Sequence, residues 1–143
     1  MKGNSMAKKQ KVWMYSPPKQ PKPKIPDALK AEVTTRANEL IDTVLKPKNI
    51  QPPPENPRFN YIVDIYGKWY HSAFYFCTKY CCPGPNAISP SFEAKFARMQ
   101  YAGNNRFHLA FMRHTGEWIE LYTDQTVDEC LAAVKDDPWF ALG

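Results

Sequence analysis

The sequence predicts an α+β domain in which a five-stranded, mainly antiparallel meander sheet carries an N-terminal and a C-terminal helix on one face. Three observations support this fold class. Apolar residues recur at helical spacing after residue 26, aromatic and β-branched residues fill five short segments between residues 59 and 122, and a helical pattern returns after residue 125. The turns between the five segments are short, and short turns join antiparallel neighbours.

The first 26 residues form a basic tail, and residues 27–143 are expected to form one domain. The tail contains seven lysines and no acidic residue, so the +5 net charge of the chain leaves −2 for the remainder. Lysine and proline alternate in residues 16–26, which predicts an extended, polyproline-like conformation. Trp13 and Tyr15 lie in a more apolar stretch, which we expect to dock on the domain or on a second copy.

The N-terminal helix begins at Pro26-Asp27, where proline suits the first turn and the carboxylate lies near the positive end of the helix dipole. Its apolar face consists of Leu29, Val33, Ala37, Leu40, Ile41, Val44 and Leu45. We expect Pro47 to end the helix because proline removes a backbone donor. Residues 46–58 then form a stiff, proline-rich connector.

The five predicted strands follow the connector. Gly67 is taken as the turn between the first two strands, and Gly103-Asn104-Asn105 and Thr115-Gly116 as later turns. The strands are then Phe59–Tyr66, Lys68–Tyr80, Phe92–Tyr101, Arg106–His114 and Glu117–Tyr122.

A capping box, formed by Thr126 and Glu129, predicts the start of the C-terminal helix. The apolar face of this helix consists of Val127, Cys130, Leu131 and Val134. Asp137-Pro138 ends it, and we expect Trp139-Phe140 to fold back onto the domain.

The fourth and fifth strands predict how the two faces of the sheet differ. If Thr115-Gly116 centres a tight hairpin, Met112 pairs with Ile119 and Ala110 pairs with Leu121, on a face that suits helix packing. The opposite face then carries Phe107, Leu109, Phe111, Arg113, Trp118, Glu120 and Tyr122. A register shift of one residue would exchange the two faces.

Two helices cannot cover both faces of five strands, so the aromatic face needs another cover. The candidates are the N-terminal segment around Trp13, a second subunit, or a ligand. Aromatic and arginine side chains are typical of protein interfaces. We therefore predict a binding or self-association domain without evident catalytic activity, acting as a homodimer or on another protein. The predicted binding or interface residues are Trp13, Tyr15, Phe107, Phe111, Arg113, Trp118, Glu120 and Tyr122.

Binding of a nucleic acid or an acidic partner through the basic tail is an alternative, since lysines neutralise phosphates without sequence selectivity. Tail and sheet aromatics could stack on single-stranded bases. The acidic balance of the folded part argues against it, because nucleic-acid-binding domains present a basic face. The lysines concerned are Lys8, Lys9, Lys11, Lys19, Lys22 and Lys24.

A second alternative is a thiol-dependent enzyme or a zinc site at Cys77, Cys81 and Cys82, with His71 as a further weak ligand candidate. Structural zinc sites bring paired ligands two to four residues apart, with a second pair elsewhere. The chain has no second pair, so packing next to a turn is favoured over a metal. Motifs for a serine nucleophile, a P-loop, a dinucleotide site or a zinc protease are absent from the sequence, and no cofactor is predicted.

The expected location is cytoplasmic, without a membrane association. Apolar runs in the sequence fall short of the eighteen residues that a spanning helix needs. The N-terminus also lacks the apolar core of a signal peptide.

A pattern of aromatic and charged residues runs through the C-terminal half. It consists of Phe92-Glu93-Ala94-Lys95-Phe96, Phe107-His108-Leu109, Arg113, Trp118, Tyr122, Leu131, Asp137-Pro138, Phe140 and Gly143. Over residues 92–143 this pattern resembles a small bacterial family of uncharacterised proteins, a domain of unknown function. The resemblance implies a W-x-x-x-Y strand followed by a helix, and it implies no activity or catalytic residue. The proline-rich first half and the cysteine cluster lie outside the pattern.

Overall fold

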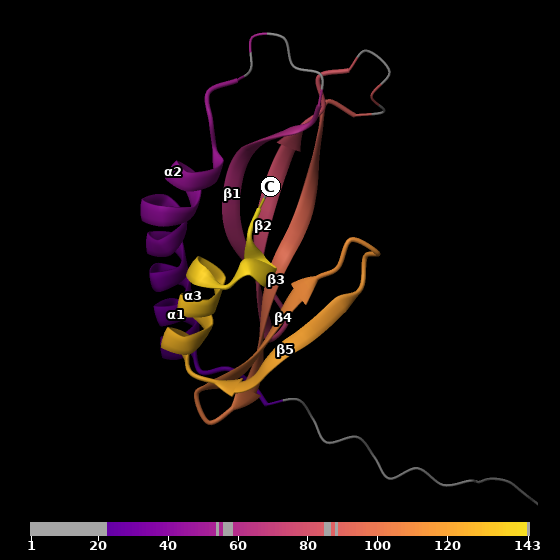
Figure 1. Cartoon of the computed structure of the whole chain (residues 1–143). Coiled ribbons are helices and arrows are strands. Elements are labelled where there is room, and N and C mark those ends of the chain that lie inside the picture. The colour runs from indigo at the N-terminus through magenta and orange to yellow at the C-terminus, as the bar shows by residue number, and fades with distance from the viewer. Residues whose placement is uncertain (1–22, 54, 56–58, 85–86, 88, 143) are drawn as a thin grey trace, which may run out of the picture.

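The computed structural model describes residues 23–53, 55, 59–84, 87 and 89–142. It confirms the predicted fold class, with five antiparallel strands paired in the order β1-β2-β3-β4-β5 (Figure 1). The strands are β1 (Tyr61–Tyr70), β2 (Ala73–Cys81), β3 (Ser91–Gly103), β4 (Arg106–Met112) and β5 (Trp118–Gln125). The helices are α1 (Asp27–Leu40), the π-helical turn η1 (Ile41–Leu45), α2 (Lys46–Asn49), α3 (Val127–Asp136) and the 3-10 turn η2 (Pro138–Phe140).

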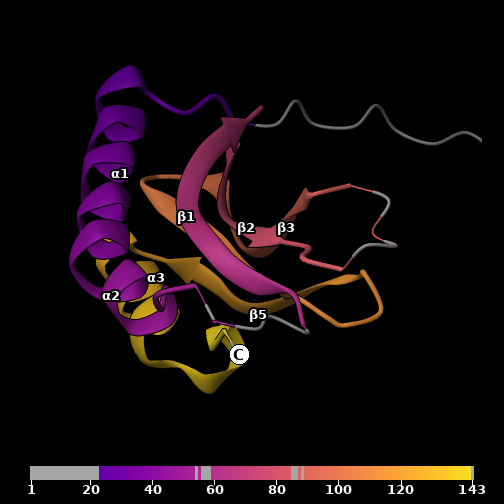
Figure 2. The same ribbon diagram turned by 90° about the horizontal axis from the view of Figure 1, so that it is seen from above.

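The N-terminal helical segment and α3 pack side by side on the same face of the sheet (Figures 1 and 2). The indole of Trp69 on β1 donates a hydrogen bond of 2.8 Å to the hydroxyl of Thr34, which ties the edge of the sheet to α1. The side chains buried in this core include Val33, Ala37, Ile41, Ile65, Phe74, Phe76, Met99, Phe107, Leu109, Cys130 and Val134. In the part of the chain that the structure describes, no helix covers the opposite face, which we call the open face.

The N-terminal helix does not end at Pro47 as predicted. It widens into η1, where the amide of Lys46 donates to the carbonyl of Ile41 five residues earlier, and then continues as α2. A wider turn relieves the clash that a proline ring makes with the preceding turn of a regular α-helix. The helix therefore passes Pro47 and ends at Asn49.

The predicted turn at Gly67 is also wrong. Gly67 lies inside β1 and pairs with Phe76, and the chain reverses four residues later at His71-Ser72. His71 has a φ of 54°, a left-handed conformation in which histidine is found more often than most residues. A glycine within a strand marks a close approach of another group to the backbone, and here that group is the ring of Phe74.

The predicted pairing of β4 with β5 is off by one residue next to the turn. Met112 pairs with Trp118 rather than with Ile119, and the amide of Arg113 donates to the carbonyl of Glu117 at 2.8 Å. The loop therefore consists of His114, Thr115 and Gly116, one residue more than the predicted tight turn, and Gly116 closes it with a φ of 89°. Trp118 therefore shares a face with Met112, whereas the prediction placed the two side chains on opposite faces.

The C-terminal segment agrees with its prediction. The hydroxyl of Thr126 accepts from the amide of Glu129 and the carboxylate of Glu129 accepts from the amide of Thr126, which completes the capping box of α3. After α3, the side chain of Phe140 is buried in the core, and the ring of Trp139 packs 4.9 Å from that of Phe111. None of the helices in the described residues is long and apolar enough to cross a membrane.

Candidate functional site

A single row of paired residues crosses the open face from β1 to β5. Lys68 pairs with Tyr75, Tyr75 with Arg98, Arg98 with Ala110, and Ala110 with Glu120. Because side chains alternate between the two faces of a strand, these five residues project from the side that the helices leave uncovered. The row places two cations, an aromatic ring and a carboxylate in line across the sheet.

Aromatic rings and cations gather where this row meets the start of β5. The rings of Tyr75 and Trp118 lie 5.7 Å apart, the guanidinium carbon of Arg98 lies 5.0 Å from the centre of the Trp118 ring, and the ammonium of Lys95 lies 6.0 Å from that of Tyr75. We call Lys68, Tyr75, Lys95, Arg98 and Trp118 the open-face cluster. A hollow of about 590 Å³ lies over it, lined by Lys68, Trp69, Tyr70, Tyr75, Lys95, Met112 and Trp118.

Arg98 reaches across a neighbouring strand to contact Trp118. Strands lie about 4.8 Å apart, so a side chain that joins β3 to β5 must pass over β4. The residue of β4 opposite Arg98 is Ala110, whose methyl group leaves room for this passage and is itself covered, with 1% exposure. Within the described residues Arg98 forms no ion pair, and its buried Nε has no hydrogen-bond partner. The guanidinium of Arg98 is thus stabilised by its cation–π contact with the Trp118 ring.

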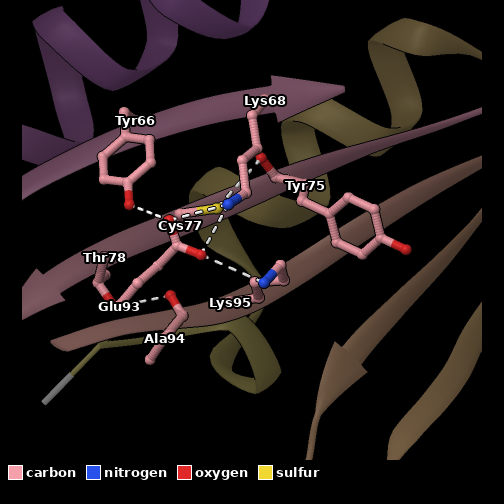
Figure 3. Close-up of polar contacts among 8 residues, drawn as sticks. All are labelled: Tyr66, Lys68, Tyr75, Cys77, Thr78, Glu93, Ala94 and Lys95. Carbon is pink, nitrogen blue, oxygen red and sulfur yellow. Dashed lines mark hydrogen bonds and ion pairs between the residues drawn. The ribbon is translucent and has the colours of Figure 1, made fainter. Parts of the chain in front are cut away.

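A carboxylate on β3 fixes the two lysines of the cluster (Figure 3). Glu93 accepts hydrogen bonds from Lys68 Nζ at 2.8 and 3.0 Å and from Lys95 Nζ at 3.2 Å. It also accepts a hydrogen bond from the hydroxyl of Tyr66 on β1. The single carboxylate of Glu93 therefore neutralises only one of the two lysine charges, and the three side chains together carry a net positive charge.

The titratable groups around Glu93 are not tuned for proton transfer at neutral pH. Hydrogen bonds from Lys68 and Tyr66 lower the pKa of Glu93 from 4.5 to about 2. Burial, followed by the charge of Glu93, raises the pKa of the Cys77 thiol from 9.0 to about 11. Burial and the hydrogen bond to Glu93 raise the pKa of Tyr66. A general acid or base works best with a pKa near the ambient pH, so these groups suit electrostatic positioning better than proton transfer.

The structure divides the predicted interface residues of the sheet between its two sides. Trp118 and Glu120 project from the open face. Phe107 is fully buried under the helices, and Phe111 is half-buried on the same side against Trp139. Phe107 is therefore unavailable to a partner in this structure.

The other predicted interface residues lie away from the open-face cluster. The hydroxyl of Tyr122 donates to the carboxylate of Asp137 beyond α3, and Arg113 lies exposed in the β4–β5 turn, 3.5 Å from Glu117. Trp13 and Tyr15 fall outside the residues that the structure describes. The same holds for Lys8, Lys9, Lys11, Lys19 and Lys22, whereas Lys24 is described and exposed.

Sequence reasoning missed Lys68, Tyr75, Lys95 and Arg98. A signal for them was present in β3, where the polar residues Arg98 and Gln100 alternate with buried Ala97, Met99 and Tyr101. The signal is interrupted because a bulge leaves Phe96 unpaired, which shifts the alternation between Lys95 and Ala97. Tyr75 was hidden in an aromatic-rich strand whose two sides look alike in sequence.

The cysteines do not gather into a site. Cys77 and Cys81 lie on one extended strand, where four residues span about 13 Å. His71 lies at the opposite end of that strand, in the β1–β2 turn. All four cysteines are free thiols, and the residues of the described ranges contain no group of three or more His, Cys, Asp and Glu side chains that could hold a metal ion.

A second hollow, also of about 590 Å³, lies on the helix side between the start of α1, the β3–β4 turn and the start of α3. Its charged side chains neutralise one another. Arg36 pairs with Glu32 at 3.4 Å and also with Asp128, which joins α1 to α3. This hollow therefore offers a ligand less free charge than the open face does.

A comparison with protein families matches residues 8–141 to a family described as a domain of unknown function, DUF3024. The match confirms the resemblance noted in the sequence and extends it beyond residues 92–143, so that it includes the proline-rich first half and the cysteine cluster. Neither a curated protein nor a solved structure matches the chain.

Proposed function

Because the chain belongs to the DUF3024 family, whose function is unknown, we propose from its own geometry that it is a binding domain for an anionic partner. The proposed working surface is the open face, and the open-face cluster supplies its main contacts. The observation that carries this proposal is a hollow that no described helix covers, lined by Lys68, Lys95, Tyr75 and Trp118, with Arg98 packed against the Trp118 ring.

The charges of the cluster favour an anion. Lys68 and Lys95 share the single carboxylate of Glu93, and Arg98 has no ionic partner among the residues of the described ranges. A guanidinium that is already stripped of some water and held in place loses little conformational freedom when it binds a carboxylate or a phosphate. The positive charge of this face also contrasts with the −2 balance of residues 27–143.

A second copy of the chain remains the predicted alternative cover. In a two-fold symmetric interface the same patch meets itself, so the cations of one copy would lie near those of the other. The N-terminal tail is similarly disfavoured as a cover, since it carries seven lysines and no acid. Sedimentation velocity over a range of concentrations tests the homodimer. A dimer that dissociates on Trp118→Ala would contradict the anionic partner.

Inorganic polyphosphate is a suitable probe because it offers closely spaced negative charge without any further chemistry. We expect calorimetric titration of the full chain at low salt to show binding that weakens as salt is added. Arg98→Gln and Lys95→Gln should each lower the affinity by about three-fold or more. Lys135→Gln, which removes an exposed cation from α3 on the helix side, is the matched control. Absence of binding, or an equal loss in all three variants, would overturn the proposal.

A further inference from the structure

We propose that the anionic partner is a single-stranded nucleic acid, whose bases stack on Trp118 and Tyr75 while its phosphates contact Lys68, Lys95 and Arg98. This inference rests on the proposed function above and narrows it to one class of polyanion. It also changes the role of the fold, because the nucleic acid would lie on the open face rather than on the basic tail alone.

The two aromatic rings provide the reason for choosing a nucleic acid over an acidic peptide. Trp118 and Tyr75 are half-buried, lie 5.7 Å apart with a tilt of 57° and line the same hollow. Any of the bases can stack on such a ring, whereas an aspartate or glutamate side chain has no ring with which to stack. Partly exposed rings next to cations are the combination that single-strand-binding surfaces use.

The cations surround the rings at distances that suit a nucleotide backbone. Arg98 lies against Trp118 and Lys95 lies near Tyr75, so each ring has a positive charge beside it. Lys68, on the edge strand β1, pairs with Tyr75 of β2 and lines the hollow. A base on either ring would therefore have a cation within reach of its phosphate.

Fluorescence anisotropy with the full chain tests this inference. The probes are labelled twelve-nucleotide strands of deoxythymidine and of uridine, together with an abasic strand of the same length and charge. We expect both base-containing strands to bind at least five-fold more tightly than the abasic strand, because stacking needs bases. A difference between the deoxythymidine and uridine strands would tell whether DNA or RNA is preferred.

Variants of the cluster locate the contacts. Trp118→Ala and Tyr75→Ala should each weaken binding of the base-containing strands by about ten-fold. Trp118→Phe keeps an aromatic ring and should therefore retain most of the affinity that Trp118→Ala loses. Trp139→Ala removes an indole that is 60% exposed on the helix side and should leave binding unchanged. Arg98→Gln and Lys95→Gln should each reduce the slope of log affinity against log salt by about 0.7. Circular dichroism confirms that each variant is folded.

The outcomes separate this inference from the proposed function. If the abasic strand binds as tightly as the others and Arg98→Gln still weakens it, the anion-binding face stands and the nucleic-acid assignment is wrong. If Trp118→Ala has no effect while replacement of Lys8, Lys9 and Lys11 by glutamine abolishes binding, the tail alone binds the polyanion and both proposals fail. Equal loss in Trp139→Ala and Trp118→Ala would also overturn the inference.

Discussion

The ring of Phe74 occupies the space beside Gly67 in which any other residue would carry its Cβ atom. A Cβ built on Gly67 lies 2.1 Å from Cζ of Phe74 and 2.7 Å from its Cε2. The same ring packs edge-on against Trp69 at 5.3 Å and Phe76 at 5.2 Å, so it is held on three sides. Gly67 thus allows a fully buried phenylalanine ring to lie directly on the backbone of β1.

Replacement of Gly67 by alanine should destabilise the fold. The added methyl group would collide with a ring that cannot move freely, and such overpacking costs about 1–3 kcal/mol. Urea denaturation followed by circular dichroism measures the loss. Gly84→Ala is the control, because a Cβ at that glycine meets no atom within 4 Å. If the two variants are equally stable, the Phe74 ring does not fill this space.

The reactivity of the cysteines should follow their burial. Burial, with the charge of Glu93 for Cys77 and of Glu129 for Cys130, raises the pKa of these thiols from 9.0 to about 11 and about 12. When the pKa of a thiol is higher by two, its thiolate fraction at a given pH is lower by roughly 100-fold. A disulfide reagent at pH 8 should therefore label the half-buried Cys81 and Cys82 first and the other two only after unfolding. The double substitution Cys81→Ser and Cys82→Ser should remove the fast phase, and its persistence would contradict the burial of Cys77.

The ion pairs of Glu93 should stabilise the fold only above acidic pH. Its pKa is lowered from 4.5 to about 2 on folding, so the folded state favours the charged form. The contribution is complete above pH 4.5 and is lost as the pH falls toward 2. Glu93→Gln should cost at most about 1 kcal/mol at pH 7, because water screens exposed pairs.

The test for Glu93 is a comparison of unfolding free energies at pH 7, 4 and 3. The difference between the Glu93→Gln variant and the original chain should shrink over this range. Glu39→Gln removes an exposed carboxylate of α1 that forms no ion pair with another described residue, and it serves as the control. A difference that stays constant down to pH 3 would mean that the lysines do not hold Glu93 in its charged form.

The capping box of α3 should contribute measurably to stability. Thr126→Ala removes the side-chain oxygen that accepts from the amide of Glu129, which costs about 1 kcal/mol. Glu129→Gln keeps an acceptor for the amide of Thr126 and should cost less. Thr35→Ala, at an exposed position of α1, is the control in the same denaturation experiment. An unchanged midpoint for Thr126→Ala would show that the rest of the fold holds α3 without its cap.

The elements were predictable because each has a local cause. Helical spacing from Leu29 to Leu45, the left-handed turn at Asn104-Asn105 and the capping box at Thr126 all act within a few residues. The face of each strand was harder to predict, because it depends on the register across a turn. One additional residue in the loop before Trp118 left this side chain on the uncovered face as predicted, but it put Phe107 and Phe111 on the helix side.

The candidate site depends on contacts between residues far apart in sequence. Arg98 meets Trp118 only because Ala110 lies between them, and Lys68 meets Glu93 across β2. The pattern of residues within one strand does not indicate which side chains of other strands they will contact. The mildly acidic charge of residues 27–143 also concealed the local excess of cations, because an average over the whole domain includes the paired acids of the helix side.

Each strand of the sheet pairs with the strand that precedes it in the chain, and this simple order affects how the molecule reaches its native state. The β1–β2, β3–β4 and β4–β5 hairpins close short loops, so little chain entropy is lost when each of them forms. Proteins rich in such local pairings fold faster than those that must join distant segments. The docking of α1 against β1 and α3 brings more distant parts of the described chain together, and we expect that late step, rather than formation of the sheet, to limit the rate of folding.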